Sequence, residues 1–349
     1  MSYLHKINEN AHVLPKIFDA ISYGAMQDAY SRSKPSGKSP EEPDFVASLV
    51  KHGVVKIKQV LDSLFNGTGI HVATTGVFCH QSPMVKFNHS GKGFRCELGD
   101  ILFVHIHKDK AGFIQRNALL LQAKMTETSV SKKTIPAAER HQLSLYRSWP
   151  NFTYDMKGGP LHGKSRTISP QNRHAGAQYL LIDSGPQFSG TTIAIDEYPM
   201  AVWMAETPLY TSRTFGNSLF DFLIMNSGRQ FSERAVARGW SNVIWDLIDN
   251  GLKKGFTRTR TGHVSTPGSR MAGSPIPSYA CFSRGFGQTT QSIVTEILGS
   301  SSSLLMQAND DGSIPPDLFA EFDFQDPVGG ISLVLIETDE SELQEEFDE

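Results

Sequence analysis

Three polar side chains in the first half of the chain could do chemistry together: Asp100, Gln122 and Lys124. A carboxylate and an amide oxygen are the hard ligands that Mg²⁺ prefers, and Mg²⁺ keeps positions for water and substrate. A nearby ammonium can position the attacking water or stabilise a pentacovalent phosphate. With Asp100 and Gln122 as metal ligands, helped by the backbone carbonyl of Ala123, the group could hydrolyse a phosphodiester. Mn²⁺ could substitute for Mg²⁺.

Two neighbouring segments must bring these residues together. The runs GDILFVHIH (99–107) and NALLLQAKM (117–125) are apolar or β-branched and flank a polar loop at 108–117, which predicts an antiparallel hairpin. Pairing symmetric about this loop places Asp100 opposite Lys124 and Met125.

The second strand of this hairpin has two different faces. Because side chains alternate along a strand, Gln122 and Lys124 share one face, whereas Leu119, Leu121 and Ala123 point to the other, apolar side. Burying the polar pair would be costly, so we expect it at a strand end that faces a cleft.

These motifs resemble the PD-(D/E)XK nuclease superfamily. The sequence from Glu97 to Asp100, followed by Gln122-Ala-Lys124 on an apolar strand, is similar to the Gln-X-Lys variant of Mrr-like restriction endonucleases. On the helix predicted at 135–149, Gln142-Leu-Ser-Leu-Tyr146 is similar to the Gln-xxx-Tyr element of RecB-like members, which supports the site and contacts DNA.

The resemblance covers about residues 44–185 and implies an α/β (α+β) fold, with a restriction-endonuclease-like mixed sheet flanked by helices. It also implies metal-dependent cleavage of DNA. The residues that it implicates are catalytic Asp100, Gln122 and Lys124, with Glu97, Gln142 and Tyr146 in supporting roles.

The chain departs from the family's pattern in its acidic ligands. Many members place a glutamate on the first helix, whereas the helix predicted at 44–65, with Asp44 as its N-cap, offers Asp44 and Asp62, and Glu41 and Glu42 come just before it. The third metal ligand is therefore unassigned.

Glu97 is an alternative third ligand if Gly99 kinks the strand. A glutamine at position 122 in place of an acid also weakens metal affinity, so an inactive DNA-binding remnant stays open.

The function that we expect is a metal-dependent DNA endonuclease of a bacterial restriction or anti-phage defence system. The alternatives are an RNase on the same fold, or a catalytically inactive nucleic-acid-binding or interaction subunit of a defence complex. Double-strand cleavage needs two copies of a site, so we expect a homodimer. A protein partner from a defence operon is a further expectation.

Other residues of the right type are better explained without a catalytic role. Cys79, His80, His89 and Cys96 could bind zinc, but their spacing matches no known knuckle, and buried thiols and surface histidines are favoured. GPQFSGTT (185–192) lacks the lysine that a P-loop requires.

Histidines and aromatic residues near the predicted site leave similar alternatives. His105 and His107 share a strand face and could serve as acid or base, although a partly exposed strand face is favoured. An aromatic group could stack on bases, but core packing is favoured. This group comprises Tyr146, Trp149, Phe152 and Tyr154.

We expect four segments along the chain. They are an N-terminal helix and linker (1–43), the nuclease domain (44–205), a helical or mixed region for specificity, dimerisation or sensing (206–336), and a disordered acidic tail (337–349).

The net charge of −3 conceals an uneven distribution. The last thirteen residues hold eight acidic and no basic residues, so the rest of the chain carries +5, and the tail could screen a basic surface. One basic stretch is predicted to contact nucleic acid, with a solvated loop as the alternative. Its residues are Lys253, Lys254, Arg258, Arg260 and Arg270.

No apolar run is long enough to span a bilayer, and the first residues lack the apolar core of a signal peptide. Three cysteines without framework spacing suit a reducing compartment. We therefore expect a cytoplasmic protein with no membrane partner.

Overall fold

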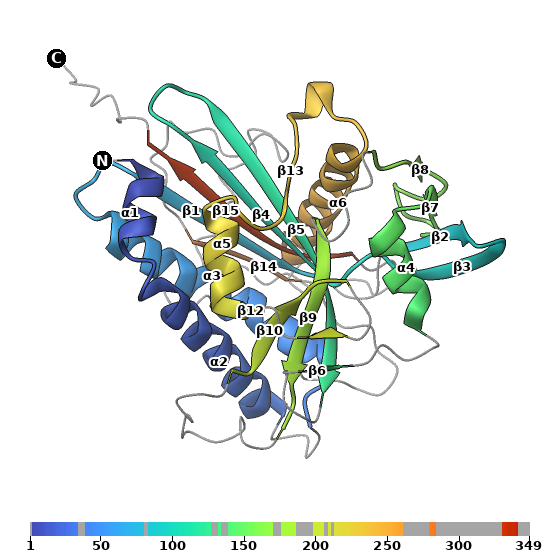
Figure 1. Ribbon diagram of the computed structural model, residues 1–349, viewed down its shortest axis with the longest axis horizontal. Helices are drawn as coiled ribbons and strands as arrows, with labels where there is room; N and C mark the ends of the chain where they lie inside the picture. Colours follow the sequence, from blue (N-terminus) through green and yellow to red (C-terminus); the bar gives the residue numbers. More distant parts are fainter. Residues whose placement is uncertain are drawn as a thin grey trace.

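The computed structural model describes residues 2–33, 39–79, 83–126, 132–133, 139–169, 176–185, 198–205, 209–210, 213–260, 279–283 and 330–340. Over these residues the chain has a mixed α/β fold, in which a mixed sheet is flanked by helices (Figure 1).

The helices are α1 (Tyr3–Glu9), α2 (Leu14–Ser33), α3 (Glu42–Phe65), α4 (Arg140–Ser148), α5 (Phe215–Leu223) and α6 (Trp240–Arg260), with a short 3-10 helix, η4 (Arg234–Val236). The strands are β1 (His71–Phe78), β2 (Met84–His89), β3 (Lys92–Glu97), β4 (Ile101–Lys108), β5 (Ile114–Thr126), β6 (Lys132–Lys133), β7 (Phe152–Tyr154), β8 (Ser165–Arg166), β9 (Ala177–Asp183), β10 (Met200–Trp203), β11 (Leu209–Tyr210), β12 (Arg213–Thr214), β13 (Arg229–Gln230), β14 (Tyr279–Ser283) and β15 (Ser332–Asp339).

The large sheet has the order β12-β10-β9-β5-β4-β15-β1-β14, and β13 pairs with the beginning of β5. Strands β4 and β5 form an antiparallel hairpin, while β9 runs parallel to β5 and β15 runs parallel to β4. Strand β15, from the C-terminal end of the chain, therefore lies inside the sheet, between β1 and β4.

Each face of the large sheet packs into its own apolar layer. Helices α1, α2, α3 and α5 cover the face that carries Leu119, Leu121 and Ala123 of β5. Helices α4 and α6 cover the other face, with Ala118 and Leu120. Successive residues of β5 thus point to opposite faces, as predicted. Both faces are buried, which is common for a central strand of a sheet.

A second sheet, in the order β3-β2-β7-β8, packs on the side of α4. Its inner face buries Val85, Phe87 and Phe152, while Lys86 and Arg95 lie opposite each other on the outer face. The sequence analysis identified none of its strands. It matters for the site because β3 leads directly into the segment that carries Asp100.

The predicted hairpin register is wrong by about two to three residues. Strand β5 begins at Ile114, so the turn is shorter than the predicted loop, and Ile101 pairs with Leu121. This register places Asp100 opposite Gln122 rather than Lys124. Asp100 is therefore closer to the side-chain amide of Gln122 than the predicted register implies.

The predicted acidic tail is wrong over residues 337–340. Residues 337–339 belong to β15, and the side chains of Glu337, Asp339 and Glu340 are buried. An acidic composition suggested solvation, but strand pairing on both sides of β15 overrides it. Residues 341–349 lie outside the described residues.

The predicted segments do not form separate units over the described residues. Residues of α2, from the first segment, and of β15, from the third and fourth, pack into the same apolar layer as β5 of the second. Within the ranges given above, no helix combines the length and the apolar character needed to cross a bilayer.

Candidate active site

Asp100 lies at the junction of the two sheets, directly before β4. Its backbone N–H donates to the carbonyl of Leu121 at 2.9 Å, and its own carbonyl accepts from the N–H of Ser332 at 3.1 Å. A Cβ at Gly99 would come within 2.6 Å of the Leu120 side chain, so a glycine allows the chain to pass close to β5 before it enters β4.

Hydrogen bonds connect the predicted site residues in one chain of contacts. The Gln142 side-chain nitrogen donates to the carbonyl of Glu97 at 3.1 Å and to Gln122 Oε1. The Gln122 nitrogen donates in turn to Asp100 Oδ2, which also accepts the N–H of Ala123 at 2.7 Å. The structure therefore links Gln142 to Asp100 through Gln122, which contacts both.

Tyr146 supports the same segment from the next turn of α4. Its hydroxyl donates to the carbonyl of Leu98 at 2.8 Å, and its ring is buried. Gln142 and Tyr146 thus hold the backbone just before Asp100, which agrees with the supporting roles expected of them.

This chain of contacts fixes which atom of Gln122 faces the aspartate. Because the carbonyl of Glu97 can only accept, Gln142 must turn its nitrogen toward it, and that nitrogen then meets the oxygen of Gln122. The nitrogen of Gln122, and not its oxygen, consequently faces Asp100. Gln122 is 2% exposed, so it is buried and hydrogen-bonded rather than turned toward a cleft.

Lys124 lies two residues beyond Gln122 on the same face of β5, and its side chain is half-buried. Its Nζ is 3.3 Å from Glu139 Oε2, at the beginning of α4. Burial alone would lower the pKa of the Lys124 ammonium, but the carboxylates of Glu42, Glu139 and Asp100 outweigh burial and raise it. The side chain is therefore a firmly held positive charge beside Asp100.

The pKa of the Asp100 carboxyl is raised. Burial, together with the negative charges of Glu42 and Glu97, raises its pKa well above the usual range, and Lys124 and the Ala123 N–H only partly oppose this. A carboxylate in this environment gains more from a bound cation than an ordinary one does.

Glu42, which lies just before the predicted helix and was left unassigned, is close enough to Asp100 to raise the pKa of that carboxyl. Asp44 is not the N-cap of α3, because the helix begins at Glu42, and the Asp44 carboxylate accepts the Glu41 N–H at 2.8 Å. Asp62 pairs with Lys58. Pro43 is the signal that could have placed the helix start earlier, since proline is favoured in the first turn.

The negative charge of the site suits a hard cation such as Mg²⁺, but only some of its side chains present the oxygen ligands that such a cation needs. Asp100, Glu42 and Glu97 supply negative charge, and both hydrogen bonds to Asp100 from described residues end on Oδ2, which leaves Oδ1 for an ion. Gln122 presents nitrogen, so its predicted metal-ligand role requires its amide to rotate. Among the described residues, no three His, Cys, Asp or Glu side chains converge as metal ligands.

Comparisons of the chain with protein-family models, with curated proteins and with solved structures give no match.

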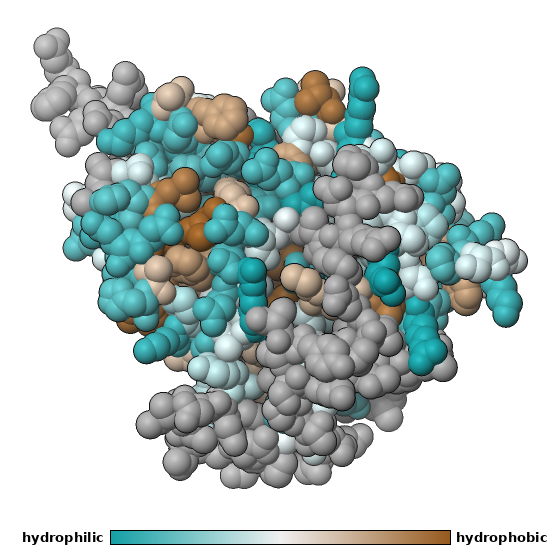
Figure 2. Space-filling model, viewed as in Figure 1, coloured by the Kyte–Doolittle hydropathy of each residue, from teal (hydrophilic) through white to brown (hydrophobic). Residues whose placement is uncertain are grey.

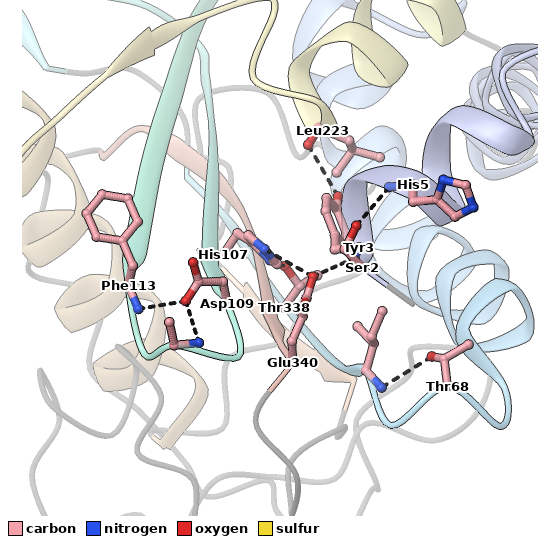
Figure 3. A network of polar contacts seen from close by, with 12 residues as sticks. Ser2, Tyr3, His5, Thr68, His107, Asp109, Phe113, Leu223, Thr338 and Glu340 are labelled. Carbon is pink, nitrogen blue, oxygen red and sulfur yellow. Dashed lines mark hydrogen bonds and ion pairs between the residues drawn. The ribbon is translucent and has the colours of Figure 1, made fainter.

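The two histidines of β4 lie far from this site and are buried. His107 is seven residues from Asp100, about 23 Å along an extended strand. Both rings contact the ring of Tyr3 in α1. The Thr338 hydroxyl forms a hydrogen bond with His105 at 3.2 Å and with His107 at 2.9 Å, the second of which is seen in Figure 3. The favoured interpretation as a partly exposed strand face is wrong, and so is a catalytic role at this site.

Because these histidines are buried, we expect a lower pH to reduce the stability of the folded chain. Burial and the neighbouring His107 lower the pKa of His105 to about 3, whereas an unfolded histidine titrates near 6.5. The unfolded chain therefore takes up a proton first as the pH falls. We expect the free energy of unfolding to fall by about 2 kcal/mol between pH 7 and pH 5 from this residue.

Urea denaturation of the wild type and of His105→Gln at both pH values measures this contribution. The His162→Gln variant, which alters an exposed histidine, is the control and should keep the full pH dependence. An unchanged dependence in His105→Gln would contradict the prediction.

The other residues named as candidates are either buried, placed on α6, or outside the described residues. Cys79 and Cys96 are buried free thiols, and His80 lies outside the described residues. The four aromatic residues proposed as a stacking platform are at most 2% exposed, so the core-packing alternative is confirmed. Of the predicted DNA-binding residues, Lys253, Lys254, Arg258 and Arg260 belong to α6, and Arg270 lies outside the described residues.

Proposed function

We propose that the protein is a metal-dependent endonuclease that hydrolyses DNA phosphodiester bonds. The observation that carries the proposal is the contact of Asp100 with Gln122, with Lys124 and Glu42 close enough to shift the pKa of the aspartate. The mixed sheet flanked by helices supports it because the family resemblance implies such a fold; β4 and β5 are antiparallel neighbours in this sheet, and β9 runs parallel to β5.

Each residue of the site has a distinct task in this proposal. Asp100, joined by Glu42, would hold Mg²⁺ or Mn²⁺, which supplies an activated water and stabilises charge on the phosphate. Lys124 keeps its proton and places a positive charge beside the reacting phosphate. Gln142 and Gln122 hold the Asp100 carboxylate in position through hydrogen bonds.

A cleavage assay tests the proposal directly. Purified protein is incubated with supercoiled plasmid and, separately, with structured RNA, each with Mg²⁺, Mn²⁺ or EDTA. We expect metal-dependent nicking or linearisation of the plasmid, reduced at least about 100-fold in Asp100→Asn and in Lys124→Ala. Cleavage in EDTA, or full activity in both variants, would exclude this site.

A catalytically inactive nucleic-acid-binding subunit is the second candidate. The orientation of the Gln122 amide favours it, because the nitrogen that faces Asp100 cannot bind a cation. Plasmid binding without cleavage in either metal would support it, and cleavage of RNA alone would favour an RNase on the same fold.

The biological setting that we propose is bacterial restriction or anti-phage defence, in the cytoplasm. A homodimer would place two sites on the two strands of one duplex. Light scattering of the purified protein measures the mass that this requires.

A further inference from the structure

The second sheet and helix α4 concentrate positive charge next to the candidate site. Residues 84–97 and 139–166 contain eight lysines and arginines and three acidic residues, a formal net charge of +5, whereas the whole chain carries −3. Figure 2 shows the side of the molecule with α4 and the β2–β3 hairpin mostly in teal and white. A one-sided concentration of charge attracts polyanions.

Part of this charge is already used within the fold. Arg95 donates to Asp155 at 2.6 Å, and Lys86 lies 3.0 Å from the same residue. Arg166 binds Asp246 through two nitrogens, at 2.6 and 2.9 Å. These cations stabilise the second sheet and its contact with α6, so they are poor candidates for a ligand.

Five exposed cations remain available. Three of them lie on the β2–β3 hairpin and α4: Lys92, at the turn between β2 and β3, and Arg140 and Arg147 on the helix. The other two, Lys157 and Lys164, lie between β7 and β8. Within the described part of the chain, no carboxylate forms an ion pair with any of them. Arg140, Ser144 and Arg147 are spaced at i, i+4 and i+7, which places them in one stripe along the helix.

Contacts between rings join the helix to the hairpin. Phe94 of β3 stacks on His141 of α4 with an interplanar angle of 2° and a centroid distance of 5.8 Å. Lys92 and Phe94 share a strand face, because they are two residues apart. Lys92 therefore lies on the side of β3 that faces α4, and we call Lys92, Arg140, Ser144 and Arg147 the basic face.

The basic face begins where the candidate site ends. Glu139, directly before Arg140, pairs with Lys124, and Gln142 on the same helix binds Gln122. The stripe from Arg140 to Arg147 is about 10 Å long at 1.5 Å per residue. One DNA strand passes about three phosphates over that length of duplex axis.

We propose that the basic face binds the backbone of double-stranded DNA and leads it to Asp100 and Lys124. The choice of DNA rests on the proposed function, whereas the binding of a phosphate backbone rests on the charge and exposure of the face. Backbone contacts of this kind set position and affinity without reading the base sequence.

Two matched triple variants test this inference. One combines Lys92→Gln, Arg140→Gln and Arg147→Gln. The control combines Lys16→Gln, Lys56→Gln and Lys110→Gln, which remove the same charge from exposed positions of α2, α3 and the β4–β5 turn. Fluorescence anisotropy with a labelled 30-base-pair duplex in EDTA, over a series of salt concentrations, reports binding without cleavage.

We expect the basic-face variant to bind at least about tenfold more weakly than the control, and its log–log salt slope to be smaller by about three. Both variants should keep the wild-type Tm because the altered side chains are exposed. If the triple variant is unstable, Lys92→Gln and Arg147→Gln alone should each reduce the salt slope by about one.

Equal affinity of the two triple variants, no binding of the duplex by the wild type, or tighter binding of a matched RNA duplex would overturn the inference. DNA binding that depends on the basic face, without cleavage in Mg²⁺ or Mn²⁺, would keep it and overturn the proposed hydrolysis. The two proposals therefore fail separately.

Discussion

A chain that ends after Gly330 is expected not to fold. Strand β15 pairs with β4 over eight residues and with β1 over seven, so its loss opens the sheet in the middle. Leu333, Val334, Leu335 and Ile336 are at most 1% exposed and contribute to both apolar layers. Each such side chain is worth about 2 kcal/mol or more, against a total stability of about 5–15 kcal/mol.

Circular dichroism and thermal melting of the truncated chain measure this effect, and the matched control is a chain that ends after Glu340. The control keeps β15 and the buried Glu340, whose carboxylate accepts the backbone N–H of Tyr3 (Figure 3). It should melt within about 4 °C of the full chain. A cooperative melt of the chain that ends after Gly330 would contradict the prediction.

The elements set by local pattern were the ones that the sequence predicted well. Strands β1 and β9 coincide with the runs HVATTGVF (71–78) and AQYLLID (177–183), since short apolar runs between polar breakers define both ends of a strand. The shared face of Gln122 and Lys124 follows from the period of a strand and needs no long-range information.

The features that depend on long-range pairing were missed. The place of β15 between β1 and β4 is decided by partners more than 200 residues away in sequence. Its acidic end was taken for a tail because composition does not reveal burial. The hairpin register failed for a smaller reason, since the mostly polar run from Ile114 to Asn117 was assigned to the loop although β5 includes it.

The sequence predicted which residues meet at the candidate site, but not how their side chains are oriented. Asp100, Gln122 and Gln142 do meet, but the direction of the Gln122 amide follows from the carbonyl of Glu97, which no motif encodes. Glu42 was named but not assigned to the site, because its role depends on where α3 begins and on the packing of that helix beside β5.

The direction of the Gln122 amide leads to the second large effect, which we expect from Gln122→Glu. The new carboxylate would still accept a hydrogen bond from Gln142, but it would lie against Asp100 Oδ2, where the amide nitrogen now donates. Two adjacent carboxylates repel each other unless a proton or a cation lies between them. The variant should therefore be less stable than the wild type without metal and should bind Mn²⁺ at least about tenfold more tightly.

Isothermal titration and thermal melting with and without Mn²⁺ measure both effects. The control, Gln115→Glu, adds the same charge to the same strand, opposite His107 and away from the site. Because a ligand that binds only the folded chain raises its stability, Mn²⁺ should raise the Tm of Gln122→Glu more than that of Gln115→Glu. Equal Mn²⁺ affinity in the two variants would show that position 122 does not face a cation site, and Asp100 would then be a structural aspartate held by its hydrogen bonds.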